Sequence, residues 1–600
     1  MENQRLFLFI ALSIVVMLLF NAWQDQYGPK PLPQLVQQPT GIANSDTENS
    51  VGRSNSDIPS SSTPIGNAVD NIPKQARSEQ PLLQPLPETT DSSAANKAQD
   101  SELSTKNSTE NDKRIRVRTD LLDIELSSKG GDIQRAALLD YPYEAAEPDV
   151  KVQLFDDKLP NLMIAQGGVL AKKGFSPSIN HHTYYDIGQT EYQLAPGADS
   201  VDVVFTYEDP TGFTVIKTLT FKRNSYVIDV NYQLQNNTGK EWTGSMYRQI
   251  QRTKPDESNQ SKFIYTFTGS VVSTPENKYE KITLDDMAEW KSEQGFTKGG
   301  WIAMSQHYFL GVVIPDALEF NRFYSKVINE SRYIIGAQTS EFSLANRESK
   351  NISSRYFIGP KEQSRLGEVA PNLDLAIDFG VLTIIAHPLF WLLNKFHEIL
   401  GNWGFAIILV TLCVKLVFFK LSEAAYRSMA NMRRFQPRIQ QLRERYINDK
   451  QRMSQAMMEL YKKEKINPLG GCLPMLVQIP VFISLYWVLL ESVELRQADF
   501  IWWLNDLSAK DPFYVLPVLM GASMLIQQRL NPAPMDPMQQ KIMQLLPIVF
   551  TLFFAFFPSG LVLYWVVNNV LSISQQWYIT RKIELAHATP ASTKSDAKKD

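Results

Sequence analysis

The stretch that decides the fold is residues 542–579, IMQLLPIVFTLFFAFFPSGLVLYWVVNNVLSISQQWYI, in which no Lys, Arg, Asp or Glu occurs. A Pro-Ser-Gly turn at 558–560 divides it into two apolar runs, Ile542–Phe557 and Leu561–Ile579. Each run is about as long as a helix that crosses a bilayer. Because a helix on a soluble protein needs a polar face for water, two such runs in succession predict an α-helical membrane domain.

Four further apolar runs raise the number of predicted transmembrane helices to six: Leu6–Trp23, Phe405–Leu421, Leu469–Leu490 and Phe513–Gln527. The first run is longer than a typical signal-peptide core, and no small-x-small cleavage site follows it. We interpret it as an uncleaved anchor, with a cleaved signal peptide as the alternative. The chain then divides into an anchor (1–23), a disordered linker (24–113), a β domain (114–370), an interfacial helix (371–402), a helical core (403–583) and a tail (584–600).

The orientation follows from the loop between the second and third spans, residues 423–467, which holds eleven Lys and Arg against five acids. By the positive-inside rule this loop is cytoplasmic, so both termini lie in the cytosol and the β domain lies outside it. The shorter apolar stretch Val381–Leu393 is interrupted by His387 and Pro388. A span there would reverse the orientation of the basic loop, so we expect a helix lying in the outer interface.

The average composition of the chain hides this division. Over 600 residues the net charge is −3, the pI is near 6.2 and the mean hydropathy is −0.22, which excludes a globally basic nucleic-acid-binding protein. Residues 24–113 are rich in Ser, Pro, Gln and Asn and cannot bury enough apolar surface to fold. The only two cysteines, Cys413 and Cys472, lie in apolar runs, so we expect no disulfide, metal site or cofactor.

A period of two marks residues 114–370 as mostly β. In Tyr226–Gln235 apolar and polar residues alternate, and Phe213–Phe221 does the same behind the turn Asp209–Gly212. Many strands without helical segments between them favour an antiparallel sandwich. His181 and His182 are adjacent, so on a strand they would point to opposite faces, and we expect both at the surface.

No catalytic motif is present: we find no HExxH, GxSxG or P-loop. We therefore expect no catalytic residue and no enzyme. Two other classes remain open. A small-solute transporter would show internal repeats and outward-facing polar residues, which we do not see. A periplasmic carbohydrate enzyme would need a pair of carboxylates in a β cleft, which the sequence alone cannot locate.

Lys415 is the only charged residue well inside a predicted span, and an ammonium group left in lipid costs at least ~2.5 kcal/mol. Snorkelling to the nearby cytoplasmic surface is the alternative. Thr411 shares its helix face, and the other spans also carry polar stripes. Most of these residues fall in the cytoplasmic half, which predicts a hydrophilic cavity open inward and sealed outward. The candidate lining residues are Lys415, Thr411, Gln478, Ser523, Gln527, Thr551, Tyr564, Trp565 and Asn568.

Four motifs of the core carry a resemblance: Asn467–Cys472, Glu494–Ala498, Asp536–Lys541 and Phe557–Tyr564. They resemble the YidC branch of the YidC/Oxa/Alb family of membrane protein insertases, closely from about Leu373 to Ile583 and more loosely over the β domain. The resemblance implies a periplasmic β-supersandwich, an interfacial helix and a five-helix core in the bacterial inner membrane. It also implies a chaperone and insertase whose groove receives nascent membrane proteins, alone or with the Sec translocon.

Two departures from the family pattern matter. Lys415 stands where the family usually has Arg, and Trp565 where it often has a second Tyr. Since Lys keeps the charge without the planar fork of Arg, we infer that the groove needs positive potential more than bidentate geometry. The C-terminal tail is short and only weakly basic, which argues against dependence on a long ribosome-binding tail.

The cytoplasmic loop is predicted to form two helices, Ser422–Tyr446 and Lys450–Ile466. A solvated hairpin and a binding surface for lipid headgroups or a partner protein are both consistent with its charge. Membrane lipids, the ribosome and the signal recognition particle pathway are partners that the family implies. The candidate binding residues are Arg433, Arg434, Arg438, Arg443 and Arg445.

Overall fold

The computed structural model describes residues 56–59, 112–255, 266–292, 295–446, 449–464, 473–531 and 537–588. The predicted anchor, nearly all of the linker and most of the tail lie outside these residues. The described strands and helices belong to one compact unit, Ile58–Pro255 with Thr268–Asp600.

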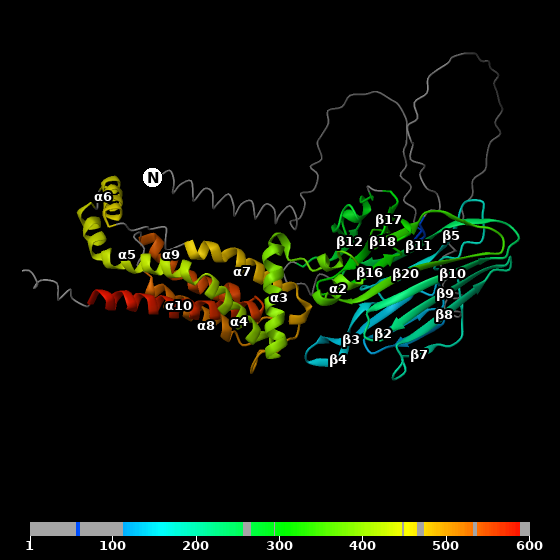
Figure 1. Ribbon diagram of the computed structural model, residues 1–600, viewed down its shortest axis with the longest axis horizontal. Helices are drawn as coiled ribbons and strands as arrows, with labels where there is room; N and C mark the ends of the chain where they lie inside the picture. The colour runs from blue at the N-terminus through cyan, green and yellow to red at the C-terminus, as the bar shows by residue number, and fades with distance from the viewer. Residues whose placement is uncertain are drawn as a thin grey trace, which may run out of the picture. The chain divides into compact units, whose positions relative to one another are not determined.

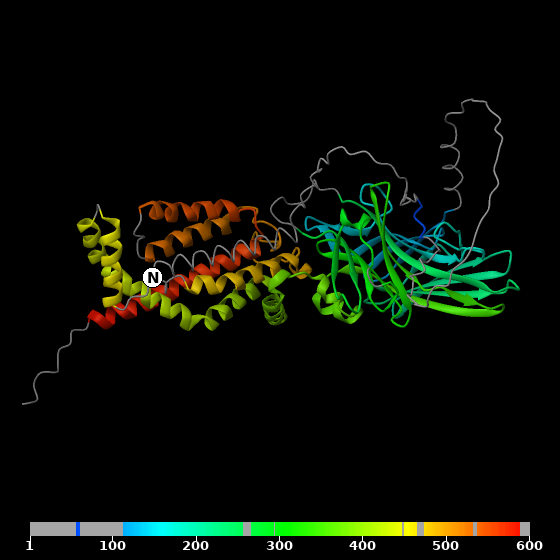
Figure 2. The same cartoon turned by 90° about the horizontal axis from the view of Figure 1, so that it is seen from above.

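The β domain consists of two large sheets, drawn in cyan to green (Figures 1 and 2). The first has the order β14 (Thr297–Lys298), β17 (Phe320–Ile328), β18 (Arg332–Thr339), β11 (Trp242–Thr253), β5 (Met163–Ala171), β3 (Ile133–Glu144), β2 (Leu122–Ser127), β1 (Arg114–Arg118) and β7 (Glu191–Gln193), with β19 (Phe342–Leu344) beside β11 and β4 (Glu147–Phe155) beside β3. The second has the order β13 (Glu280–Thr283), β12 (Gly269–Ser273), β15 (Trp301–Ser305), β16 (Phe309–Pro315), β20 (Glu348–Pro360), β10 (Val227–Asn236), β9 (Phe213–Lys222), β8 (Ser200–Glu208) and β6 (Asp186–Ile187).

The predicted antiparallel β architecture is confirmed, since the described strand pairs are antiparallel apart from β1 with β7. In β10 every second side chain is buried, from Ile228 to Leu234, as the alternation predicts. The turn before β9 is also as expected, with the N–H of Gly212 donating to the carbonyl of Asp209 at 2.9 Å. Alternation of the sequence therefore reports the buried face correctly.

Several polar residues of the β domain are buried, and Lys217 and His181 are two of them. Lys217 in β9 is 5% exposed, and its Nζ donates to the carbonyls of Gly130 and Gly131 at 3.0 and 2.7 Å. His181 was expected at the surface, and this is wrong: it is 2% exposed and its Nδ1 lies 2.5 Å from the hydroxyl of Tyr247. The reason is that His181 lies in a loop, where the alternation of a strand does not apply and the phenol of Tyr247 gives one ring nitrogen a hydrogen-bond partner.

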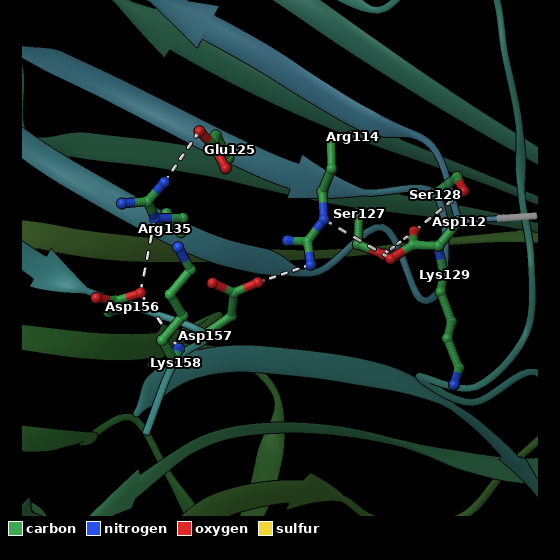
Figure 3. A network of polar contacts seen from close by, with 10 residues as sticks. All are labelled: Asp112, Arg114, Glu125, Ser127, Ser128, Lys129, Arg135, Asp156, Asp157 and Lys158. Atoms are coloured by element: carbon green, nitrogen blue, oxygen red, sulfur yellow. Dashed lines mark hydrogen bonds and ion pairs between the residues drawn. The ribbon is translucent and has the colours of Figure 1, made fainter. Parts of the chain in front are cut away.

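On β1, β2 and β3 of the first sheet and the turn after β4, charged side chains form a network of ion pairs (Figure 3). Arg114 pairs with Asp157 at 2.7 Å, and Arg135 lies 3.4 Å from Glu125 and 3.6 Å from Asp156. These groups are partly exposed, so water screens the pairs and each adds little to stability.

A connector of helices leads from β20 to the helical core: α2 (Gln363–Val369), η3 (Leu373–Ala376), η4 (Gly380–Leu382) and α3 (Thr383–Leu400). The short helix η2 (Asp286–Ala288) belongs to the β domain. The α3 helix packs on α4 (Trp403–Val417) and α7 (Leu473–Glu491) and runs across them in Figure 1. Its Ala386, Leu389, Phe390 and Leu393 are buried, while Ile384 and Trp391 are 88% and 62% exposed. The helix thus has apolar side chains on both its buried and its exposed sides, and its place in the membrane interface stays a prediction.

The basic loop forms the two predicted helices, α5 (Phe419–Arg445) and α6 (Lys450–Lys463). Asp449 caps α6 by accepting the N–H of Arg452 at 2.9 Å. The two helices share an apolar core of Ile439 and Tyr461, with partly buried Met432, Phe435, Met457 and Leu460 around it. The hairpin therefore has packing of its own.

The remaining core helices are α7, α8 (Val515–Leu530), α9 (Pro537–Phe554) and α10 (Ser559–Ala588), with η5 (Val493–Leu495) following α7. The span predicted to continue to Leu421 instead ends at Val417, because the chain bends at Phe418. Among the described helices, none alone has the length and hydropathy of a complete bilayer span; α4 together with Phe419–Ala430, bent by 67°, meets the criterion as a pair.

Candidate functional site in the helical core

Lys415 is held between two helices of the core. It is 7% exposed, and its Nζ on α4 donates to the hydroxyl of Ser572 on α10 at 2.7 Å. That hydroxyl in turn donates to the carbonyl of Asn568 at 2.7 Å. In the part of the chain that the structure describes, no carboxylate forms an ion pair with Lys415. The site therefore contains a buried positive charge whose observed partner is neutral.

Thr411 lies one turn before Lys415 on the same face of α4 and is fully buried. Its hydroxyl donates to the carbonyl of Ile407 at 2.7 Å, within its own helix. Thr411 thus keeps the surroundings of Lys415 polar without leaving an unsatisfied group.

A second polar contact joins α8 to α10. Ser523 is 7% exposed; its hydroxyl donates to the carbonyl of Met520 at 2.7 Å and accepts from the side-chain amide of Asn569 at 2.9 Å. Further along α10, the amide of Gln576 donates to Asn531 at 3.0 Å. Gln527 is half-buried. Polar side chains therefore line α10 on two sides, toward α4 and toward α8.

Thr551 on α9 is used in helix packing. Its hydroxyl donates to the carbonyl of Pro547 at 2.7 Å, and it lies directly against Gly521 of α8. A Cβ atom on Gly521 would come within 2.0 Å of the Thr551 oxygen. The small residue on α8 is what allows the two helices to approach this closely.

Aromatic side chains join α7, α9 and α10. The Phe482 ring lies 6.1 Å from that of Tyr564 and 4.7 Å from that of Trp565, and the Phe554 ring lies 5.2 Å from Trp565. Tyr564 is 3% exposed, and Gln478 on α7 is half-buried. The indole N–H of Trp565 is buried and has no hydrogen-bond partner among the described residues.

The structure thus connects some of the predicted lining residues and separates others. Lys415 is bonded to Ser572, which bonds the backbone carbonyl of Asn568 and not its side chain, and Ser523 is joined to α10 through Asn569. Thr551 and Tyr564 serve helix contacts of their own. Asn569 was not predicted. The sequence analysis assigned one polar face to each helix, and on α10 that face holds Asn568 and Ser572, which are four residues apart. Asn569 lies on the adjacent face, which contacts α8.

The described arginines of the hairpin are exposed. Arg438 lies 3.4 Å from Glu464, and the guanidinium of Arg445 lies 5.9 Å from the ring of Tyr446. The side chains of Arg433, Arg434 and Arg443 lie outside the described residues. An exposed pair such as Arg438 with Glu464 is weak, so this arginine remains available to another anion.

A cavity of about 650 Å³ on the second sheet bears on the alternative of a carbohydrate enzyme. Its lining contains two carboxylates, Asp229 and Asp316. Asp229 forms an ion pair with Lys222 at 2.6 Å, and Asp316 accepts the N–H of Leu318 at 2.8 Å in a turn. Both carboxylates therefore have structural partners, and among the residues described around this cavity no acid–base pair is assembled.

Comparison with known proteins matches the chain in two consecutive parts that meet within α3. Residues 114–392 match the family described as YidC periplasmic domain, and residues 395–587 match the family described as 60Kd inner membrane protein. A membrane protein insertase YidC of Nitrosococcus oceani is 46% identical over 585 residues, covering 97% of this chain and 99% of that protein. The YidC of Alkalilimnicola ehrlichii is 46% identical over 602 residues, covering 100% and 99%.

A solved structure of an active YidC insertase with its first transmembrane domain resolved shares 18% identity, with a TM-score of 0.36 over 78% of this chain and 92% of that one. The curated relatives are insertases and not enzymes, which removes the carbohydrate enzyme as an alternative. Identity above 40% over nearly the whole length, with both family matches in order, means that the chain belongs to the YidC family of inner-membrane protein insertases.

Proposed function

We propose that insertion proceeds through a hydrophilic groove formed by α4, α7, α8, α9 and α10, with Lys415 as its positive charge. One observation supports this most: Ser572 holds the lysine inside the apolar core, and no described carboxylate pairs with it. A buried ammonium of this kind is expensive to maintain, which favours a functional role. Trp565 and Gln478 lie on the helices that would face a substrate segment.

The proposed mechanism is physical. A hydrated recess shortens the apolar barrier that the translocated tail of a substrate must cross, and Lys415 attracts acidic residues in that tail. The apolar stem of the substrate then moves sideways into lipid. This releases ~25 cal/mol for each Å² of apolar surface removed from water, enough to drive insertion without a nucleotide.

The proposed topology has six spans, both termini in the cytosol and a periplasmic β-supersandwich. The hairpin α5–α6 then faces the cytosol, where its arginines receive the substrate or contact anionic lipid headgroups. The Sec translocon, the ribosome and the signal recognition particle pathway are the partners proposed from family membership. The β domain is proposed to dock to the translocon.

The test is depletion of the protein in cells, with a matched measurement in vesicles. We expect a defined set of multi-pass and short-tailed membrane proteins to remain uninserted after depletion. Purified protein in lipid vesicles should restore their insertion without nucleotide. Unchanged insertion in depleted cells together with inactive vesicles would contradict the proposal.

A further inference from the structure

The segment between α7 and α8, residues 492–514, is bound to the ends of several core helices; we call it the α7–α8 loop. Apolar side chains of this loop are buried: Leu507 is 1% exposed and Leu504 3%. The carboxylate of Asp506 accepts several hydrogen bonds from within the loop. Its Oδ1 accepts from the backbone N–H groups of Gln497, Ser508 and Ala509 at 3.1, 2.8 and 3.2 Å, and from the Ser508 hydroxyl at 2.6 Å.

The same part of the loop covers the N-terminus of α10. The Ser559 hydroxyl donates to the carbonyl of Asp506 at 2.9 Å, and the N–H of Gly560 donates to the carbonyl of Leu507 at 2.9 Å. The N–H of Ser559 donates to the carbonyl of Ala509 at 2.7 Å. The first N–H groups of a helix have no partner within the helix, so the loop supplies the acceptors that α10 lacks.

The loop also binds the N-termini of α4 and α8. Asn402, which caps α4, donates its side-chain amide to the carbonyl of Phe500 at 3.0 Å, and the Phe500 ring lies against Gly404. Asp511 accepts the N–H of Leu516 in the first turn of α8 at 2.7 Å and the indole N–H of Trp503 at 3.0 Å. The α7–α8 loop, which is continuous with α7, therefore forms hydrogen bonds to the N-termini of α4, α8 and α10.

We propose that the α7–α8 loop is the periplasmic seal of the groove, and that Asp506 is the positioning residue that keeps it closed. The proposal rests on the proposed function, in which the groove is hydrated from the cytosol. A groove open to water on one side conducts ions unless its other end is closed. Leu504 and Leu507 supply the apolar closure, and the bonds to Asp506 hold these leucines between the helix ends.

The test measures proton leak across vesicles that contain the purified full-length protein and a trapped pH-sensitive dye, with no substrate present. Asp506→Leu removes all four acceptor bonds of the carboxylate, and we expect the leak to rise several-fold. Asp506→Asn keeps an acceptor oxygen and should be as tight as the parent. Asp499→Ala is the matched control, because Asp499 is an exposed acid of the same loop and its carboxylate forms no described bond.

If Asp506→Leu does not fold, Ser559→Ala takes its place, because it deletes only the hydrogen bond from the Ser559 hydroxyl to the carbonyl of Asp506. The proton leak of Ser559→Ala should exceed that of the parent and of Asp506→Asn. A folded Asp506→Leu protein as tight as the parent would overturn the seal, as would equal leak in Asp499→Ala. Failure of the proposed groove gives a different result. The vesicles would then remain tight, and insertion would not depend on the charge of the substrate tail.

Discussion

Lys415 combines two properties that are rarely found together: it is nearly fully buried, and within the described chain no counter-charge contacts it. An ion pair would neutralise it and leave no potential for a substrate, whereas the hydroxyl of Ser572 orients the ammonium group and keeps its charge. A substrate carboxylate is the partner that such a group attracts in a site less screened than bulk water.

At Lys415 the expected result depends on the tail of the substrate. Lys415→Arg should remain active because the charge stays, Lys415→Ala should impair insertion mainly of acidic tails, and Lys415→Glu should be worse because like charges repel. Ser572→Ala is the matched control, since it removes the hydrogen bond and leaves the charge. The measurement is insertion of one reporter with an acidic or a neutral tail. An equal response of both tails would make Lys415 a structural lysine.

Glu494 predicts a pH dependence at the junction between α7 and the connector. One of its oxygens accepts the N–H of Gln363 at 3.2 Å, the other is buried with no hydrogen-bond partner among the described residues, and burial raises the pKa of this carboxyl to about 7. The folded state therefore keeps a proton that the unfolded state loses. The contribution of this carboxyl to stability is fully present below about pH 4.5 and is lost as pH rises toward 7, by up to about 1.4 kcal/mol per pH unit.

Glu494→Gln should flatten this dependence and raise the thermal midpoint at about pH 8, because the amide keeps an acceptor and has no charge to bury. The midpoint of the full-length protein in detergent, followed from about pH 5 to pH 8, is the measurement. Asp499→Asn serves as the control for an exposed acid of the same region. Identical pH profiles for parent and Glu494→Gln would show that another group causes the dependence.

At the scale of elements, the hairpin is a self-packed unit joined to the core through the bend at Phe418. Its apolar core at Ile439 and Tyr461 holds α5 against α6. The start of α5 also packs on α10, where the side-chain amide of Gln575 donates to the carbonyl of Phe419 at 3.2 Å. Arg438 and Arg445 are exposed and are not members of this apolar core.

Neutralising the five hairpin arginines to Gln should lower the crosslinking yield between the hairpin and a ribosome-bound nascent chain. These residues are Arg433, Arg434, Arg438, Arg443 and Arg445. The matched control neutralises Lys462 and Lys463, which are exposed at the end of α6. An unchanged crosslinking yield in the five-residue variant would mean that the arginines set the orientation of the chain in the membrane and do not bind the nascent chain.

At the scale of the whole chain, the β domain contacts the helical core through a few polar bonds. Arg496 donates to the carbonyls of Pro142 and Tyr143 at 2.8 Å each, and His307 lies 3.0 Å from the carbonyl of Leu490. These contacts explain part of the Glu494–Ala498 motif, because Glu494 and Arg496 both bind groups of the β domain or its connector.

Replacing Arg114–Asn351 by a short linker should leave most insertion intact and lower the thermal midpoint of the core. The reason is that the bond between Lys415 and Ser572 lies within the helical core, while the bonds of Arg496 and His307 are lost. Insertion in vesicles and the midpoint are measured on the same preparation. Loss of insertion in a core that remains folded would contradict the groove-centred mechanism.

The sequence by itself determined the division of the chain, the strands of alternating residues, the two hairpin helices and the isolation of Lys415 within an apolar run. Each of these depends on local composition or periodicity, which report how a segment meets water or lipid. The four core motifs also indicate the family, because they are short contiguous stretches that do not depend on which helices pack together.

Only the tertiary structure decided which groups meet. Lys415 and Ser572 are 157 residues apart, His181 is buried by a tyrosine from another strand, and Asp506 binds a loop whose turns no periodicity encodes. The bend at Phe418 likewise divides a run that hydropathy treats as continuous. Periodicity describes the face that a residue occupies; the partner on that face is set by helix and sheet packing between distant segments, which hydropathy along the chain does not contain.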